Sequence, residues 1–231
     1  MVLLAMLHMA HLASTESALG RWIVSEGGVI GGGVAVRILG GRRGLYATED
    51  LSAGTELARV PKSCLVFAEE SDMQPGWGLS LSEFLVANLG GARYRGEKTP
   101  YMDALPAAES LLADWTPAER ALLESPCLER KVRCQADHRS SMVRNVAKWV
   151  PKADASMLVW AETMVRSRAL TFESGWKGSE MMCMVPFVDL ANHRVPLPGE
   201  VPCFPVHLER SFGEECVVSR ERTQQWASLW C

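Results

Sequence analysis

Hydrophobic and polar positions follow two different periods along the chain. Between residues 26 and 67, short apolar runs are separated by glycine-rich turns, a pattern that predicts strands. From residue 79 onward, apolar positions recur every three or four residues, as on the buried face of a helix, and strand-like runs return near Met181. The pattern therefore predicts an α+β fold in which helices interrupt a β framework. The first predicted strands are Val34–Leu39, Leu45–Thr48, Glu56–Val60 and Leu65–Phe67.

Capping signals mark the starts of the predicted helices. In a capping box, a Ser or Thr and a Glu three residues later bond each other's backbone amides, and two such pairs occur here. The second pair is followed by proline at the first helical position, where its missing amide costs nothing. A third helix follows from apolar spacing alone. The helices are predicted to begin after Ser80, Thr116 and Asp154, the first ending at Gly90-Gly91 and the third at Arg168.

The stretch from Met184 to His193 reads M-V-P-F-V-D-L-A-N-H and begins as an apolar run typical of a buried strand. It ends on Asp189, Asn192 and His193, whose polar groups a core strand would leave unsatisfied. A bound polar ligand is one way to satisfy them. Arg168 adds a cation near an apolar helix surface, so the two segments together predict a ligand pocket.

Composition narrows the class of protein. A chain of 231 residues with 48% hydrophobic side chains can bury a substantial core and is not typical of disordered proteins. Its 27 acidic and 24 basic residues give a net charge of -3, which offers no reason to expect nucleic acid as the main partner. We expect a protein or small-molecule partner.

Seven cysteines without a C-x-x-C pair argue against a disulfide framework and against a zinc site. They predict reduced, mostly buried thiols in an intracellular protein of the cytoplasm or nucleus, with the chloroplast as an alternative. The apolar first residues are interpreted as an N-terminal helix or a targeting segment. No other segment is expected to cross a membrane.

Four separated motifs occur in one order: a Gly-Arg-Arg-Gly-Leu-Tyr-Ala run, a Pro-Tyr followed by Leu-Pro, a helix ending in Ser-Arg-Ala, and the Asn-His stretch. In this order they resemble the SET-domain protein methyltransferases, in the class of the Rubisco large-subunit lysine methyltransferase and the actin histidine methyltransferase. The resemblance implies a SET-type β fold of short strands with a large helical insertion. The matching pieces are Gly41–Ala47 with Leu51–Gly54 and Val60-Pro61, Pro100-Tyr101 with Leu105-Pro106, Trp160–Ala169, and Pro186–His193.

Pattern and resemblance together predict four regions. Residues 1–25 form the N-terminal helix or targeting segment, and residues 26–78 the N-terminal part of the SET domain. Residues 79–178 form the helical insertion, and residues 179–231 an incomplete C-terminal part of the SET domain.

The resemblance implies transfer of a methyl group from S-adenosyl-L-methionine to a side-chain nitrogen of a protein, with lysine the expected acceptor and histidine an alternative. It assigns no metal. Each implied residue also has a plainer interpretation, such as a turn glycine, a solvated arginine at a helix end or a core histidine. The implied cofactor-binding residues are Arg43, Gly44 and Leu45, which offer backbone, Arg168, which faces a carboxylate, and Asp189, Asn192 and His193.

The C-terminal segment departs from the family pattern. The family places a tyrosine that lines the methyl-transfer site after the strand resembling Glu215–Ser219. The tyrosines here are Tyr46, Tyr94 and Tyr101, so no catalytic residue is assigned. We expect reduced or absent activity for the chain as given. The alternative function is a non-catalytic SET-like protein-binding module or an inactive fragment, and in either case we expect a monomer.

Two other enzyme classes find little support. A dinucleotide-binding fingerprint needs a helix after its glycines, whereas the glycine-rich run Gly27–Gly33 is followed by a predicted strand. A hydrolase built on His193 with Cys183 or Cys203 lacks any flanking nucleophile motif.

Overall fold

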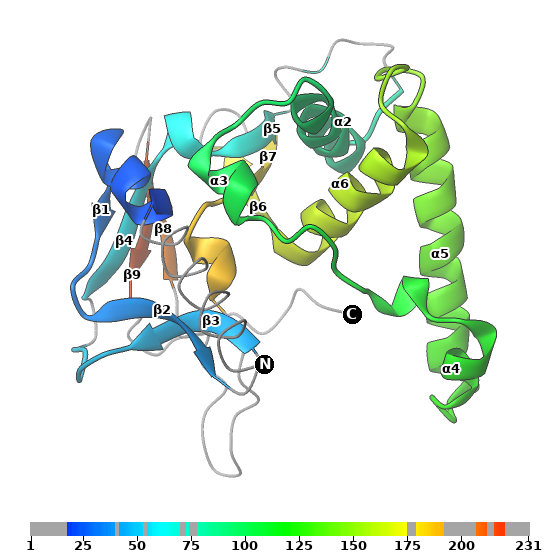
Figure 1. The fold of residues 1–231 in the computed structure, drawn as a ribbon, viewed down its shortest axis with the longest axis horizontal. Coiled ribbons are helices and arrows are strands. Elements are labelled where there is room, and N and C mark those ends of the chain that lie inside the picture. The colour runs from blue at the N-terminus through cyan, green and yellow to red at the C-terminus, as the bar shows by residue number, and fades with distance from the viewer. Residues whose placement is uncertain are drawn as a thin grey trace, which may run out of the picture. The chain divides into compact units, whose positions relative to one another are not determined.

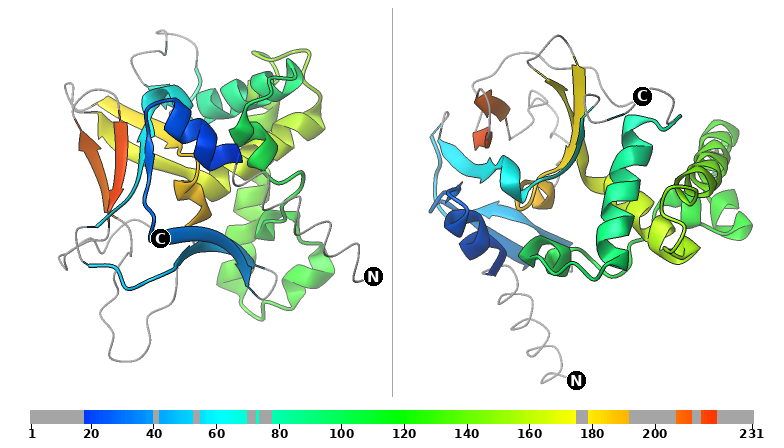
Figure 2. Two further views of the ribbon diagram at one scale, coloured as in Figure 1. Left: turned by 60° about the vertical axis from the view of Figure 1, so that its left-hand side comes forward. Right: turned by 90° about the horizontal axis from the view of Figure 1, so that it is seen from above.

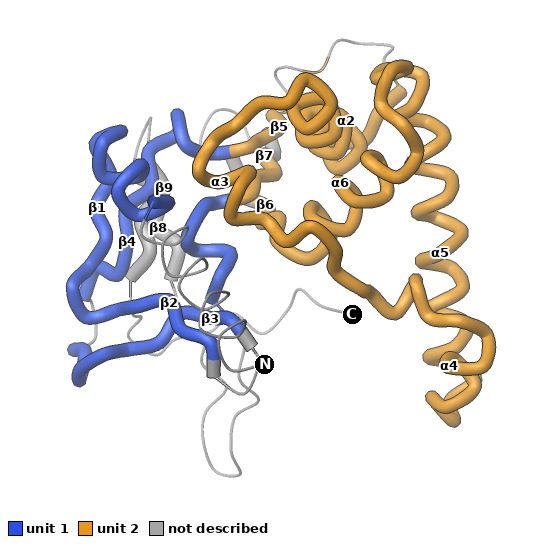
Figure 3. The backbone as a smooth tube through the Cα atoms, viewed as in Figure 1, with its two compact units in different colours: residues 1–65, 185–231 blue, residues 66–184 orange. Residues whose placement is uncertain are grey.

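The computed structural model describes residues 18–39, 42–52, 55–69, 73, 78–174, 179–191, 207–211 and 215–219. Its described strands form antiparallel sheets, and the chain divides into two compact units (Figures 1 and 3). The first unit comprises residues 1–65 and 185–231, and the second comprises residues 66–184. The helices α2 to α6 all belong to the second unit.

The first unit contains a sheet of order β1-β4-β9-β8 and a separate pair, β2-β3. Strands β8 and β9 come from the distant C-terminal part of the sequence, and β9 pairs with β4 so that Val60 lies opposite Cys216 (Figure 2). Residues 18–25 are helical and bury Leu19 and Ile23. The elements are β1 (Val29–Ile30), β2 (Val34–Leu39), β3 (Arg42–Ala47), β4 (Glu56–Pro61), η1 (Lys62–Cys64), η4 (Val188–Leu190), β8 (His207–Ser211) and β9 (Glu215–Ser219).

The glycine-rich run in this unit allows backbones to approach closely. A Cβ added to Gly28 would lie 2.5 Å from the carbonyl oxygen of Arg59 on β4 and 2.6 Å from Ile23. The run is followed by strand β2, so it lacks the strand-turn-helix context of a dinucleotide site, as the sequence predicted. Gly28 and Gly31 are explained by close packing against the β4 backbone, and Gly27 by its positive φ of 94°.

The second unit consists of a sheet of order β5-β7-β6 and the helices that pack on it. Helices α2 and α6 lie side by side in each view, and α5 contacts both (Figures 1 and 2). The Asn88 amide of α2 donates to the Phe67 carbonyl of β5 at 3.2 Å. The elements are β5 (Val66–Glu69), α2 (Leu81–Tyr94), α3 (Pro100–Ala104), η3 (Leu112–Asp114), α4 (Pro117–Ala121), α5 (Pro126–Val146), α6 (Ala155–Arg168), β6 (Ala169–Ser174) and β7 (Ser179–Met184).

The core of the second unit joins α2 and α6 to the sheet. The core residues named below are almost completely buried, and burial of each Val, Leu or Met side chain among them stabilises the fold by about 1.5–3 kcal/mol relative to exposure. Trp160 of α6 also donates from its indole to the Pro106 carbonyl at 2.9 Å, and Arg93 lies 3.9 Å above its ring. The core residues include Ala68, Leu85, Val86, Leu89, Leu158, Ala161, Met164, Met181 and Cys183.

The predicted helix starts are confirmed. Ser80 and Thr116 both form capping boxes, and the Asp154 carboxylate accepts from the Met157 amide at 2.8 Å. The predicted end of the first helix at Gly90-Gly91 is wrong, because α2 continues to Tyr94. A Cβ on Gly90 would lie 2.9 Å from Leu158, so this glycine lets α6 pack closely and does not end the helix.

Strands return earlier than the sequence predicted. Strand β6 begins at Ala169, directly after α6, whereas the prediction placed the return at Met181. The predicted strand over Met184–His193 is also wrong. Of its described part, only Met184 lies in a strand, because Pro186 has no amide to donate and the chain then turns into η4.

The structure describes only part of the four regions predicted from the sequence. Residues 1–17, which would form most of the N-terminal helix or targeting segment, lie outside the described residues. The predicted boundaries of the four regions stay predictions. Among the described helices, none combines the length and the apolar character needed to span a membrane.

Candidate functional site

Strand β3 carries the first group of predicted cofactor residues. Arg43, Gly44 and Leu45 pair with Ile38, Arg37 and Val36 of β2 in regular antiparallel register. Side chains alternate along a strand, so Arg43 and Leu45 point to one face and Gly44 belongs to the other. Gly44 is buried, whereas Arg43 and Leu45 are half-buried. At Gly44, β3 therefore presents buried backbone without a side chain.

The turn before η4 has an unusual backbone. Phe187 is buried and adopts φ 71° and ψ -44°, a combination that costs a bulky residue about 1–3 kcal/mol. The Asp189 amide closes the turn by donating to the Val185 carbonyl at 3.0 Å. Val188 and Leu190 are buried on either side of Asp189, which is itself half-buried. The strained turn thus places a carboxylate between two apolar anchors.

The structure brings β3 and η4 into contact within the first unit. Residues 43–45 and Asp189, about 145 positions apart in sequence, therefore lie on elements that touch. Asn192 and His193 follow closely after Ala191, the last residue described in this stretch, and lie outside the described residues. The cofactor roles of all these residues stay predictions.

Arg168, the remaining predicted cofactor residue, ends α6 in the second unit. Its guanidinium forms an ion pair with Glu109 and donates to the Ser167 hydroxyl at 2.6 Å. The side chain is 11% exposed. The sequence predicted that this guanidinium faces a carboxylate of the cofactor, and the structure gives it a carboxylate from the protein.

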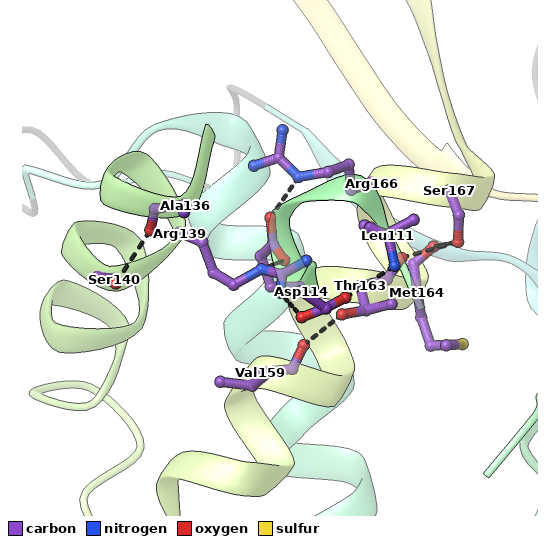
Figure 4. Close-up of polar contacts among 11 residues, drawn as sticks. Leu111, Asp114, Ala136, Arg139, Ser140, Val159, Thr163, Met164, Arg166 and Ser167 are labelled. Carbon is purple, nitrogen blue, oxygen red and sulfur yellow. Dashed lines mark hydrogen bonds and ion pairs between the residues drawn. The ribbon is translucent and has the colours of Figure 1, made fainter. Parts of the chain in front are cut away.

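A buried polar cluster in the second unit was not predicted. Arg139 of α5 donates to Glu162 of α6 at 2.6 Å and also pairs with Asp114 of η3, while Arg166 donates to the second oxygen of Glu162 at 2.5 Å (Figure 4). Glu162 is 1% exposed and Arg139 is 7% exposed. Two arginines and two acids make the cluster neutral overall, so its charges satisfy one another.

The sequence indicates this cluster only once the burial of α6 is known. Residues 158 to 165 of α6 are nearly all buried, and Glu162 sits among them. A carboxylate at such a position requires a cation, but nothing local identifies Arg139, which lies 23 residues earlier. The Arg139 Nη2 is buried without a hydrogen-bond partner, but both Glu162 oxygens accept from arginines of the cluster and its charges balance, so we interpret it as structural.

Four cysteines are free thiols: Cys64, Cys127, Cys134 and Cys183. Cys64 and Cys183 are buried as predicted, whereas Cys127 and Cys134 are exposed on α5. Burial raises the pKa of the Cys64 thiol and so disfavours the nucleophilic thiolate. The partners proposed for a Cys183 hydrolase, His193 and Cys203, lie outside the described residues.

Comparison with solved structures identifies the fold. The chain superposes on the SET domain of LSMT bound to lysine and AdoHcy with a TM-score of 0.69, at 18% sequence identity over 89% of this chain and 50% of that one. It also superposes on Rubisco LSMT bound to AdoMet with a TM-score of 0.68, at 18% identity over 89% of this chain and 49% of that one. The chain has the SET-domain fold. This confirms the fold class predicted from the sequence.

The SET-fold chain spans about half the length of these solved structures. A third, Rubisco LSMT bound to sinefungin and monomethyllysine, gives a TM-score of 0.66, at 18% identity over 89% of this chain and 49% of that one. No protein-family model matches the chain, and no curated protein matches it. At this level of identity the likeness establishes the fold and leaves the activity to be proposed.

Proposed function

We propose that this SET-fold protein transfers a methyl group from S-adenosyl-L-methionine to a side-chain nitrogen of a protein, with lysine as the expected acceptor. The observation that carries the proposal is the SET fold itself, in which β3 and η4 come into contact. Of the solved structures with this fold, one is bound to lysine and AdoHcy, one to AdoMet, and one to sinefungin and monomethyllysine.

The residues present fit such a cofactor chemically. The carboxylate of the cofactor can be bound by a guanidinium, and its adenine by hydrogen-bonding groups. Its sulfonium can lie against backbone that no side chain of its own blocks. Gly44 supplies buried backbone without a Cβ of its own. Arg168 supplies a guanidinium, whose several donors can bind two carboxylates at once, so its pairing with Glu109 does not exclude another.

When bound, S-adenosyl-L-methionine supplies an electrophilic methyl group on its sulfonium. In the proposal, the backbone around Gly44 lies against the cofactor, Arg168 holds its carboxylate, and the segment from Asp189 to His193 orients the remainder. An acceptor lysine must lose a proton, and its ordinary pKa is ~10.4. Apolar surroundings such as Val188 and Leu190 exclude water and favour the neutral amine.

Calorimetric titration of the full chain with S-adenosylhomocysteine tests the binding half of the proposal. The Gly44→Val variant should bind at least about tenfold more weakly, equivalent to 1.4 kcal/mol, because a branched side chain fills the backbone surface. Gly32→Val is the matched control, since an added Cβ there meets nothing within 4 Å. Equal affinities of the two variants would contradict the assignment of β3. Circular dichroism of both variants checks that they fold.

A second assay separates transfer from binding. Radiolabelled S-adenosylmethionine is incubated with the chain and a lysine-rich acceptor protein, and label on the acceptor is counted. Transfer that Arg168→Met reduces at least about tenfold, while Lys98→Met at an exposed position leaves it unchanged, supports the proposed enzyme. Binding of S-adenosylhomocysteine without any transfer supports the non-catalytic module instead. Absence of binding contradicts both.

A further inference from the structure

Helix α5 has one face packed and one face exposed. It contacts α2, α6 and η3, and its buried residues follow one stripe along the helix. This stripe consists of Val132, Arg139, Met142 and Val146. In Figure 1 the helix lies at the edge of its unit. The exposed face therefore contributes little to the core.

Cations gather on the exposed side of α5 and on the turn that follows it. Between residues 126 and 152 there are seven basic and two acidic side chains, a net charge of +5 in a chain whose net charge is -3. The remaining residues therefore carry -8. The basic residues are Arg130, Lys131, Arg133, Arg139, Arg144, Lys148 and Lys152, and all except Arg139 are exposed.

Most of these exposed cations lack a partner in the part of the chain that the structure describes. Arg133 lies 3.9 Å from Glu129, and Lys148 donates to the Asn145 amide oxygen at 3.2 Å. Arg130, Lys131 and Arg144 make no ion pair with a described residue.

Other cations of the same unit are either paired or scattered. Arg139, Arg166 and Arg168 are paired with carboxylates. Arg93, Lys98 and Arg120 also make no ion pair with a described residue, but they lie on separate segments. The exposed cations of α5 and its following turn instead lie close together in the chain.

An exposed aromatic side chain adjoins this surface. Trp149 follows α5 directly and is 44% exposed. Tryptophan and arginine are enriched at protein interfaces, where they supply apolar contact and bidentate hydrogen bonds. We call the surface formed by Arg130, Arg133, Arg144, Lys148 and Trp149 the α5 basic face.

We propose that the α5 basic face docks an acidic segment of a partner protein. Charge complementarity favours a polyanionic partner, and the position of Asp137 indicates which class of polyanion fits. Asp137 lies between Arg133 and Arg144 on the same face, one turn from the first and two turns from the second. A phosphate backbone, with uniform charge, meets repulsion at Asp137, whereas a peptide can place a neutral or basic residue there. This inference does not rest on the proposed methyl transfer.

Fluorescence anisotropy of the full chain with a labelled glutamate-rich peptide tests the proposal. A peptide of about 16 residues is long enough, because the helix spans ~30 Å. The Arg130→Glu/Arg144→Glu variant should bind at least about tenfold more weakly than the unaltered chain, and its binding should fall with added salt. The matched control is Arg37→Glu/Lys98→Glu, which changes the net charge equally at exposed positions outside α5. It should lose less than about threefold.

Three results would overturn the proposal. Equal loss in the two double variants would mean that only net charge matters. Tighter binding of an oligodeoxythymidylate of equal charge than of the peptide would assign the surface to nucleic acid. Failure of the unaltered chain to bind the peptide even at low salt would remove the docking site. Because the substituted residues are exposed, thermal unfolding should be unchanged, and Arg130→Gln/Arg144→Gln provides a milder pair that should still weaken binding.

Discussion

The two compact units differ in where they place charge. All three buried polar or charged side chains among the described residues lie in the second unit: Arg139, Glu162 and Thr163. In the first unit the buried side chains that the structure describes are apolar, and Asp189 is half-buried at the contact of η4 with β3. Among the described residues, buried charged side chains thus stabilise the fold. We expect ligand binding at polar groups that are partly exposed.

The difference teaches how to separate a site from a scaffold. Judged by burial alone, a carboxylate paired with two arginines resembles a functional site. Here Glu162 is satisfied on both oxygens by protein donors, which leaves it nothing to offer a ligand. Substitutions at the buried ion pairs of the second unit and at the close backbone contacts of the first unit test this difference.

Removing the charge of Glu162 should have the largest effect. Glu162→Gln keeps the shape of the side chain but leaves Arg139 buried with less compensation, which should lower the free energy of unfolding by about 3–5 kcal/mol. Urea denaturation measures this loss. The control Glu129→Gln removes an exposed pair at 3.9 Å and should cost less than about 0.5 kcal/mol.

The double variant Arg139→Met/Glu162→Leu sharpens the same prediction. It should recover most of the lost stability, because it removes both buried charges together, while Asp114 and Arg166 are partly exposed and can be hydrated. If Glu162→Gln keeps full stability but loses affinity for S-adenosylhomocysteine, the cluster belongs to the site and the comparison is wrong.

In the first unit, backbone proximity should matter more than charge. Gly28→Ala places a Cβ 2.5 Å from the Arg59 carbonyl, so β4 or the helix over residues 18–25 must shift, and we expect a loss of about 1–3 kcal/mol. Gly32→Ala, where the added atom meets nothing within 4 Å, is the matched control in urea denaturation. Similar stabilities of the two variants would show that the close approach is relaxed at no cost.

The smallest effect should come from the cap of α2. Burial raises the pKa of Glu83, but hydrogen bonds from the Ser80 amide, the Asn145 amide and the Ser80 hydroxyl together hold it below its ordinary value of 4.5. A lowered folded-state pKa adds stability above about pH 4.5, and that stability is lost as the pH falls through the folded-state value. Glu83→Gln should therefore cost about 1 kcal/mol near neutral pH.

The pH series provides the check. The stability difference between Glu83→Gln and the unaltered protein should shrink as the pH is lowered from about 7 to about 3, because the native carboxyl becomes protonated. Glu124→Gln, at an exposed position, should show no such trend. A difference that stays constant across the series would mean that the charge of Glu83 contributes nothing.

Local signals in the sequence were sufficient for several elements. Ser80 and Thr116 marked helix starts correctly, since a cap depends on a side chain and an amide three residues apart, and apolar spacing placed the third start at Asp154. Strand β2 was predicted with its observed bounds from a β-favouring run between glycine turns. The order of the four motifs further led to the fold class, which the superposition on SET domains confirms.

The tertiary structure decided what depends on distant partners. Gly90 continues a helix because Leu158 packs against it, and Glu162 is charged and buried because Arg139 reaches it from another helix. The contact of β3 with η4 joins residues about 145 positions apart, and β9 crosses a comparable distance to pair with β4. Side-chain periodicity encodes which face of an element is buried, but it carries no information on which element covers it. That choice follows from packing the whole chain at once.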